Sequence, residues 1–195
     1  MLWLIVGLIL FLGAHSVSIV DVQWRDRMVT RLGPLAWNAA YGLTALIGLI
    51  AIVIGYGEIR ASGAAILLYQ PPIWMRHITL LLMLPVFVLL LAAYLPGRIQ
   101  RVTKHPMLLA VKLWAFAHLL ANGTLADVLL FGGFLAWAVA DRISLKRRTP
   151  IPVPGAPSAR FNDGIALGGG LVLYLLFLFW LHQALFGVAP LGAVG

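Results

Sequence analysis

Long apolar stretches alternate with short polar segments along the whole chain. A helix needs about 20 residues to cross the roughly 30 Å hydrocarbon core of a bilayer. Six stretches are read as spans on this basis, at roughly residues 1–20, 35–57, 73–95, 106–121, 124–141 and 165–187. The fourth and fifth are short and qualify only as a hairpin. The pattern predicts an all-α fold, a polytopic bundle of about six transmembrane helices.

The junction between the fourth and fifth stretches carries clear local signals. Asn122-Gly123 is a tight-turn dipeptide. Thr124 is followed three residues later by Asp127, the spacing of a capping box at a helix N-terminus. We therefore expect a tight turn there, and a fifth helix that begins at once after it.

Composition excludes a soluble globule. Hydrophobic residues make up 62% of the 195-residue chain and charged residues 10%, and the mean hydropathy is +0.99. Soluble domains have about 45–50% apolar and about 25% charged residues. We expect a single integral membrane domain over residues 1–195. The first stretch lacks the basic region and the cleavage site of a secretory signal, so we interpret it as a retained span.

Positive charge is unevenly distributed between the loops. Most of the 14 basic residues lie in segments 21–34, 96–105 and 142–164. The positive-inside rule makes these segments cytoplasmic and places both termini outside. The net charge of +8 therefore reflects topology and predicts no nucleic-acid partner. The basic, proline-rich loop 143–164 is expected to be extended, as a docking strand, an anionic-lipid contact or a plain spacer.

The candidate chemistry lies in ionisable residues at membrane depth, because burying them is costly without a partner or cavity. The chain has no cysteine, which excludes disulfides, iron–sulfur clusters and thiolate metal ligands. No GxSxG, HExxH or Walker motif is present. Helix direction assigns the histidines to two depths. His15 and His105 lie towards the inner face, and His77, His118 and His182 lie towards the outer face.

The inner group includes three candidate catalytic residues. Lys112 follows His105 by seven residues, which places both on one helical face. Asp141 ends the fifth span at the same membrane face. These residues predict a polar pocket open to the cytoplasm, near His15 and Tyr41. Interfacial anchoring of polar side chains at the headgroup level is the alternative.

The outer group suggests a cofactor site. His118 with His77 or His182, from a neighbouring span, would supply the two imidazoles of a bis-histidine haem. Hydrogen bonding between helices is the competing interpretation. His118 points away from His105 around the same helix, so both cannot bind one small ligand.

Three segments resemble the NnrU family: GLILFLGAHSVSI near the start, Trp37–Gly42, and KHPMLLAVKLWAFAHLLANGTLADVLLFGGFLAWAVADR at residues 104–142. The likeness covers nearly the whole chain. It implies a multi-pass protein of the bacterial inner membrane, associated with denitrification and nitric-oxide metabolism, whose biochemical activity is undefined. The implied partners are the lipid bilayer and either a membrane protein or a small apolar or redox ligand.

The family is related to plant zeta-carotene isomerase, a membrane enzyme that uses haem b. That relationship implies His15, in the His-Ser motif, as an axial ligand of the haem iron. His105 and His118 match histidines found there too, so His15 and His118 are the candidate iron ligands. The isomerase has further histidines late in its fifth span, whereas residues 130–140 of this chain contain none. A second ligand must come from elsewhere.

The His105-Pro106 start of the fourth span also resembles the isoprenylcysteine methyltransferase-like membrane enzymes. Those enzymes bind S-adenosylmethionine at the cytoplasmic face and end in acidic, Tyr-rich sequence, where this chain has only Asp141-Arg142 and then prolines. Three hypotheses therefore stay open: a haem-binding isomerase or redox protein, a small-molecule methyltransferase, and a non-catalytic factor for a denitrification enzyme.

Overall fold

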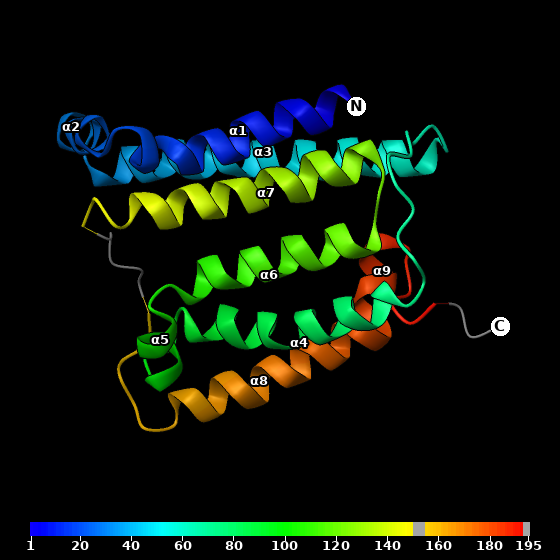
Figure 1. The fold of residues 1–195 in the computed structure, drawn as a ribbon. Helices are drawn as coiled ribbons and strands as arrows, with labels where there is room; N and C mark the ends of the chain where they lie inside the picture. The colour runs from blue at the N-terminus through cyan, green and yellow to red at the C-terminus, as the bar shows by residue number, and fades with distance from the viewer. Residues whose placement is uncertain (150–154, 193–195) are drawn as a thin grey trace. The chain divides into compact units, whose positions relative to one another are not determined.

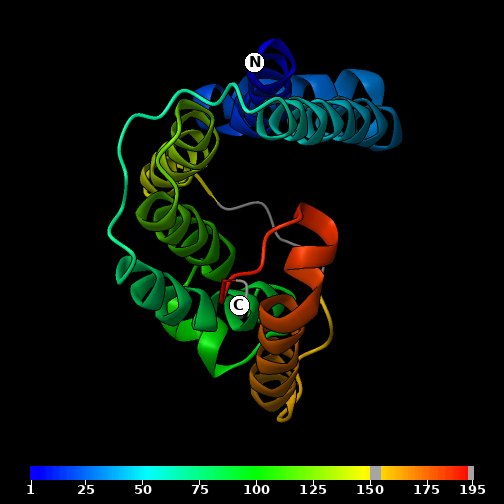
Figure 2. The ribbon, with the colours of Figure 1, turned by 90° about the vertical axis from the view of Figure 1, so that its right-hand side faces the viewer.

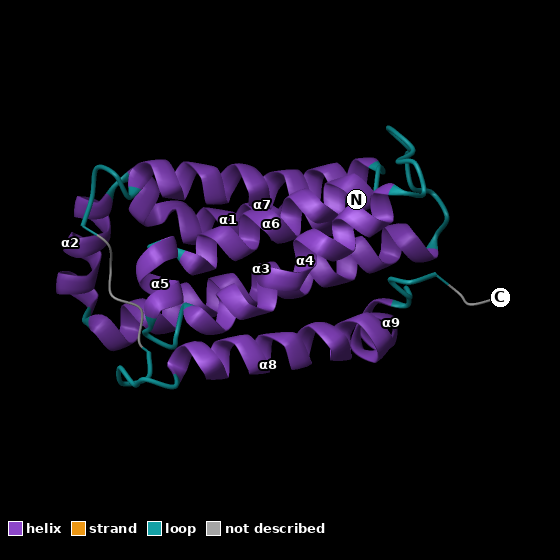
Figure 3. Ribbon diagram, turned by 60° about the horizontal axis from the view of Figure 1, so that its bottom comes forward, coloured by secondary structure: helices purple, strands orange, loops and turns teal. Residues whose placement is uncertain are grey.

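The computed structural model describes residues 1–149 and 155–192, and its regular elements are helices (Figures 1 and 3). In chain order they are α1 (Leu2–Val20), α2 (Val22–Leu32), α3 (Pro34–Ala61), α4 (Met75–Ala92), α5 (Arg98–Thr103), α6 (Pro106–Ala121), α7 (Leu125–Ser144), α8 (Asn162–Leu176), the π-helix η1 (Phe177–Leu181) and α9 (His182–Phe186). The described residues contain no β-strand, only an isolated bridge between Leu67 and Thr124. The predicted all-α class is confirmed.

Each predicted span corresponds to a helix. Four helical segments are long and apolar enough to cross a membrane: α1, α3, α4 and the continuous run Asn162–Phe186. Helix α6 is apolar but shorter, and α7 carries three charged residues along its 20-residue length. The chain is therefore a multi-pass membrane protein. In the loop 143–164, residues 150–154 lie outside the described part, and residues 155–160 form no helix.

Two helices, α2 and α5, lie where loops were expected. Both are short, and α2 is rich in arginine, so neither shows the apolar length of a span. Helix α2 begins at Asp21, whose side chain accepts a hydrogen bond from the Trp24 backbone N–H at 2.8 Å. It ends at Gly33, whose φ of 81° favours glycine, and Pro34 then starts α3. Local capping explains these helix limits.

The chain forms two compact units that interleave in the sequence. Unit 1 comprises Met1–Pro71 and Asn122–Pro150, and so contains α1, α2, α3 and α7. Unit 2 comprises Pro72–Ala121 and Ile151–Gly195, and so contains α4, α5, α6, α8, η1 and α9. Each unit has its own helix packing.

In unit 1, α1 and α3 lie side by side with their backbones in close contact (Figure 2). Three glycines make this approach. A Cβ added at Gly7 would lie 2.5 Å from Ile52 N, and one at Gly55 would lie 2.2 Å from Leu4 N. Gly48 faces the backbone of Phe11 in the same way. Small residues allow membrane helices to approach this closely and so gain dispersion contacts.

The start of α7 is tied to α3 by a buried carboxylate. The predicted capping box is confirmed: the Thr124 hydroxyl accepts from the Asp127 N–H, and the Asp127 carboxylate accepts from the Thr124 N–H at 2.9 Å. Asp127 is only 5% exposed and also accepts a hydrogen bond from the Tyr56 hydroxyl at 2.5 Å. This carboxylate therefore links a helix cap to the neighbouring helix.

The loop after α3 covers the tight turn that precedes α7. The Tyr69 hydroxyl donates to the Asn122 carbonyl at 2.8 Å, and Gly123 lies against the Tyr69 backbone too closely for any Cβ. Partial burial and the nearby Asp127 carboxylate raise the pKa of the Tyr69 phenol, so its hydroxyl remains a donor at neutral pH. The predicted Asn-Gly turn is thus held by a distant loop.

Unit 2 is built on α4, which packs against α6 and α8. Its core includes Val86, Leu89 and Ala110. Hydrogen bonds from side-chain hydroxyls to backbone carbonyls join the helices: Thr79 donates to Ala117 O on α6 at 3.0 Å, and Tyr174 on α8 donates to Leu80 O at 3.1 Å.

Asn162 holds the loop before α8 against the loop after α4. Its side chain is buried and donates to Pro96 O at 2.8 Å and to Pro157 O at 3.0 Å. Asn162→Ala should lower the free energy of unfolding by about 2 kcal/mol, since two carbonyls lose their donor. Denaturant titration of the detergent-solubilised protein measures this. Exposed Asn38→Ala is the control, and an equal effect of both changes would contradict the proposed linkage.

Candidate functional site

His15 lies in an aromatic cluster between three helices of unit 1. Its ring stacks on Phe11 with centroids 4.3 Å apart, and it lies 5.3 Å from the ring of Tyr41 on α3. Trp137 on α7 meets His15 edge-on at 5.9 Å. The structure thus brings His15 and Tyr41 together, as the grouping of inner polar residues predicted, and adds an indole.

The environment of His15 determines which of its two ring nitrogens carries the proton. Nδ1 lies 2.7 Å from the Phe11 carbonyl oxygen. A carbonyl can only accept a hydrogen bond, so Nδ1 carries the proton and the lone pair is on Nε2. Metal-ligating histidines typically show this arrangement, with the second nitrogen held by a carbonyl or carboxylate.

Trp137 contributes an unsatisfied donor to the same cluster. Its Nε1 is buried and has no hydrogen-bond partner within the described part of the chain. A buried N–H without an acceptor costs about 1–3 kcal/mol. The cluster therefore combines a lone pair, a hydroxyl group and a buried donor. Trp137 was not predicted as a site residue from the sequence. It lies four residues before Asp141 and therefore on the same helical face, and this spacing could have identified it.

A second pair of imidazoles lies in unit 2. The rings of His118 on α6 and His182 have centroids 6.4 Å apart and planes inclined by 22°. His118 Nδ1 donates to Trp114 O at 2.8 Å, and His182 Nδ1 donates to Val188 O at 2.7 Å. In both rings the lone pair is therefore on Nε2. The two rings are stacked and nearly parallel.

Irregular backbone positions His182. The π-helix Phe177–Leu181 immediately precedes it, and Gly187, in the left-handed conformation, turns the chain so that Val188 O reaches the ring. A single π-turn inserts an extra residue and re-aims the side chains that follow, and it often occurs at functional sites. Periodicity predicted a regular helix here, so the sequence did not reveal this turn.

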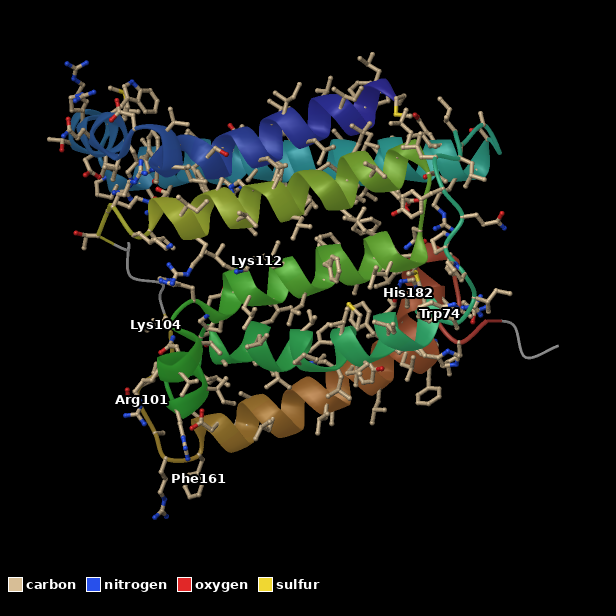
Figure 4. The ribbon with its side chains drawn as sticks, viewed as in Figure 1. Trp74, Arg101, Lys104, Lys112, Phe161 and His182 are labelled. Atoms are coloured by element: carbon tan, nitrogen blue, oxygen red, sulfur yellow. The ribbon has the colours of Figure 1, made fainter. Side chains whose placement is uncertain are left out.

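Within unit 2, His182 lies at the end opposite the basic residues that precede α6. His182 and Trp74 lie at one end of the unit, and Arg101 and Lys104 lie at the other (Figure 4). His77 is exposed at the Trp74 end, where its Nδ1 contacts Trp74 O at 3.1 Å. The His118–His182 contact therefore belongs to the end opposite Lys104, and His77 is not in the pair.

The three candidate catalytic residues are divided between the two units. Lys112 belongs to α6 of unit 2 and His105 immediately precedes that helix, whereas Asp141 belongs to α7 of unit 1. The Asp141 carboxylate pairs with Arg148 at 2.5 Å, with both side chains less than 15% exposed. Lys112 is half-buried and makes no ion pair among residues 1–149 and 155–192 (Figure 4). Their joint action on one substrate stays a prediction.

The two histidine clusters contain few groups able to ligate a metal ion. Within the described residues, no three His, Asp or Glu side chains gather into a metal-ion site. An imidazole with its lone pair on Nε2 is one of the groups that can ligate haem iron. Aromatic rings and a buried N–H surround His15.

Comparison with known proteins identifies the family. The family model described as NnrU protein matches residues 3–190. No curated protein and no solved structure matches the chain. The match spans nearly every helix described above and agrees with the resemblance carried by residues 104–142. The chain therefore belongs to the NnrU family.

Proposed function

We propose that this chain binds haem b in unit 1, with His15 as the protein ligand of the iron, and serves denitrification or nitric-oxide metabolism in the bacterial inner membrane. The observation that carries the haem proposal is the His15 environment: Nδ1 is fixed by Phe11 O, and the buried Trp137 N–H lacks an acceptor within the described residues. The biological role rests on the family resemblance.

The residues of the cluster have distinct tasks in this proposal. His15 would hold the iron through Nε2, and its hydrogen bond to the Phe11 carbonyl fixes the ring orientation. Phe11 and Tyr41 exclude water from the ring faces, while Trp137 offers its N–H to a polar group of the bound molecule. When bound, haem supplies electron transfer and the binding of small gases such as nitric oxide.

The His118–His182 pair is the alternative ligand set, because it brings together two imidazoles from different helices. The two sets predict different spectra. His15 is the one histidine in the sequence segments of unit 1, so it would give a single imidazole ligand from that unit. The pair would give a six-coordinate, low-spin haem.

The haem proposal is tested by absorbance of the purified chain after expression with added haem precursor. We expect a Soret band, and His15→Ala should lower the haem-to-protein ratio about tenfold or more, as loss of a metal ligand does. His77→Ala is the matched control, because that histidine is exposed.

Other outcomes assign other functions. A Soret band that survives in His15→Ala but disappears in His118→Ala and His182→Ala would move the haem to unit 2. A wild-type chain that stays colourless after addition of hemin would end the haem proposal. If that colourless chain bound S-adenosylmethionine, the methyltransferase hypothesis would replace it. Deletion in a denitrifying host, with nitric-oxide consumption measured, tests the role separately.

A further inference from the structure

We infer that a groove at one end of unit 2 binds the phosphate of an anionic phospholipid, a function independent of the haem proposal. The groove has a volume of about 560 Å³ and lies between the start of α5 and the segment before α8. Its polar lining is Arg98, Gln100, Arg101, Ser158, Arg160 and Asp163.

Charge in the groove favours an anion. Three exposed guanidinium groups line it, and none forms an ion pair within the described part of the chain. The one carboxylate, that of Asp163, accepts hydrogen bonds from Arg98 N at 2.8 Å and Ile99 N at 3.0 Å. Guanidinium groups recognise phosphate oxygens through two parallel N–H bonds. With three positive side chains and one negative side chain, the groove has a net positive charge, which favours binding of an anion.

The walls of the groove are held in place before any ligand arrives. Buried Asn162 joins Pro96 O to Pro157 O, and Ala156 N donates to Tyr94 O at 2.8 Å. Asp163 fixes the first turn of α5 from the opposite side. Because both walls are fixed by these bonds, binding requires less ordering of the backbone, which favours affinity.

Apolar side chains around the groove favour a lipid over a soluble phosphate. Phe161 is 62% exposed beneath the Arg160 guanidinium, which lies 4.5 Å from the ring centroid. Tyr94 and Val102 are also exposed. Arg101 and Phe161 project from the same end of unit 2 (Figure 4). An acyl chain would cover such surface, whereas a free phosphate would leave it in water.

The position along the spans agrees with this assignment. Helix α4 ends at Ala92 and α8 begins at Asn162, so the groove lies beside the ends of two apolar helical segments that are long enough to cross a membrane. The distribution of basic residues predicts that this end is cytoplasmic. Basic pockets at such helix ends bind the head groups of anionic lipids.

The experiment measures lipid retention by native mass spectrometry on the detergent-purified full chain, titrated with phosphatidylglycerol or phosphatidylcholine. The groove variant combines Arg98→Gln, Arg101→Gln and Arg160→Gln. The control removes the same charge elsewhere with Arg27→Gln, Arg31→Gln and Arg76→Gln, all at exposed positions outside the groove and outside the loop 143–164. We expect the groove variant to retain about tenfold less phosphatidylglycerol and the control to change less than about twofold.

Three results would overturn the proposal. The first is an equal loss of phosphatidylglycerol in the groove variant and the control, and the second is equal retention of both lipids by the wild type. The third is displacement of phosphatidylglycerol by millimolar inorganic phosphate, together with binding of that phosphate in the absence of lipid. The last result would indicate a site for a soluble anion. If the glutamine variant does not fold, replacing the same three arginines with lysine preserves the charge and removes the planar guanidinium groups. That variant should bind about threefold less; wild-type retention would contradict recognition by arginine.

Discussion

Gly55→Leu is expected to separate α1 from α3 and to lower the free energy of unfolding by about 3 kcal/mol or more. A Cβ at Gly55 would lie 2.2 Å from Leu4 N and 2.7 Å from Trp3 C, so the obstacle is backbone that cannot rotate away. The whole helix must shift, and the neighbouring contacts of Gly7 and Gly48 are lost with it. Unfolding by titration with dodecyl sulfate, followed by far-UV circular dichroism, measures this loss.

Gly57→Leu is the matched control for this prediction. It lies on the same helix two residues further on, and nothing lies within 4 Å of its added Cβ. Both variants gain the same side chain and the same helix propensity, so the difference between them isolates the steric effect. We expect Gly57→Leu to stay within about 0.5 kcal/mol of the wild type. Equal destabilisation would show that helix contact through Gly55 does not stabilise unit 1.

Asp127→Ala is expected to destabilise unit 1 by about 3 kcal/mol, because the carboxylate serves two structures at once. It accepts hydrogen bonds from the Thr124 N–H and hydroxyl at the α7 cap, and it also accepts one from the Tyr56 hydroxyl at 2.5 Å. Its removal leaves the partly buried Tyr56 hydroxyl without this acceptor. The same dodecyl sulfate titration measures the effect.

A double-mutant cycle separates the two contributions. Tyr56→Phe removes only the link between α3 and α7 and should cost about 1.5 kcal/mol, the range for a hydrogen bond to a charged group. In the double variant with Asp127→Ala the effects should be less than additive, because both changes remove the same bond. Full additivity would contradict the link. Asp26→Ala, at an exposed ion pair, is expected to change stability by less than about 0.5 kcal/mol.

Much of the fold follows directly from the apolar pattern. The predicted spans 1–20 and 106–121 coincide with α1 and α6 to within a residue, since a membrane helix must satisfy its backbone internally and so fills its apolar stretch. The Thr124–Asp127 capping box was also readable, because its two side chains act on backbone three residues away. The helix limits and the capping box could therefore be predicted, because interactions between residues close in the sequence determine both.

The remaining features depend on contacts between distant residues. The segment before His182 is uniformly apolar, so the π-turn there causes no visible change in the periodicity of apolar and polar residues. A regular helix was therefore expected. Tyr56 and Asp127 are 71 positions apart, and only packing of α3 against α7 brings them together. Helix direction gave the order of the histidines along unit 2, whereas their partners required the fold.

Interleaving of the two units in the sequence has a consequence for biosynthesis. When the ribosome has translated residue 121, unit 1 still lacks α7, and unit 2 still lacks α8 and its C-terminal continuation. Helices α1 and α3 can pair early through their glycines, but α7 reaches them only after α4 and α6 have entered the bilayer. Neither unit is encoded by one contiguous gene segment, so maturation of both waits for late translation.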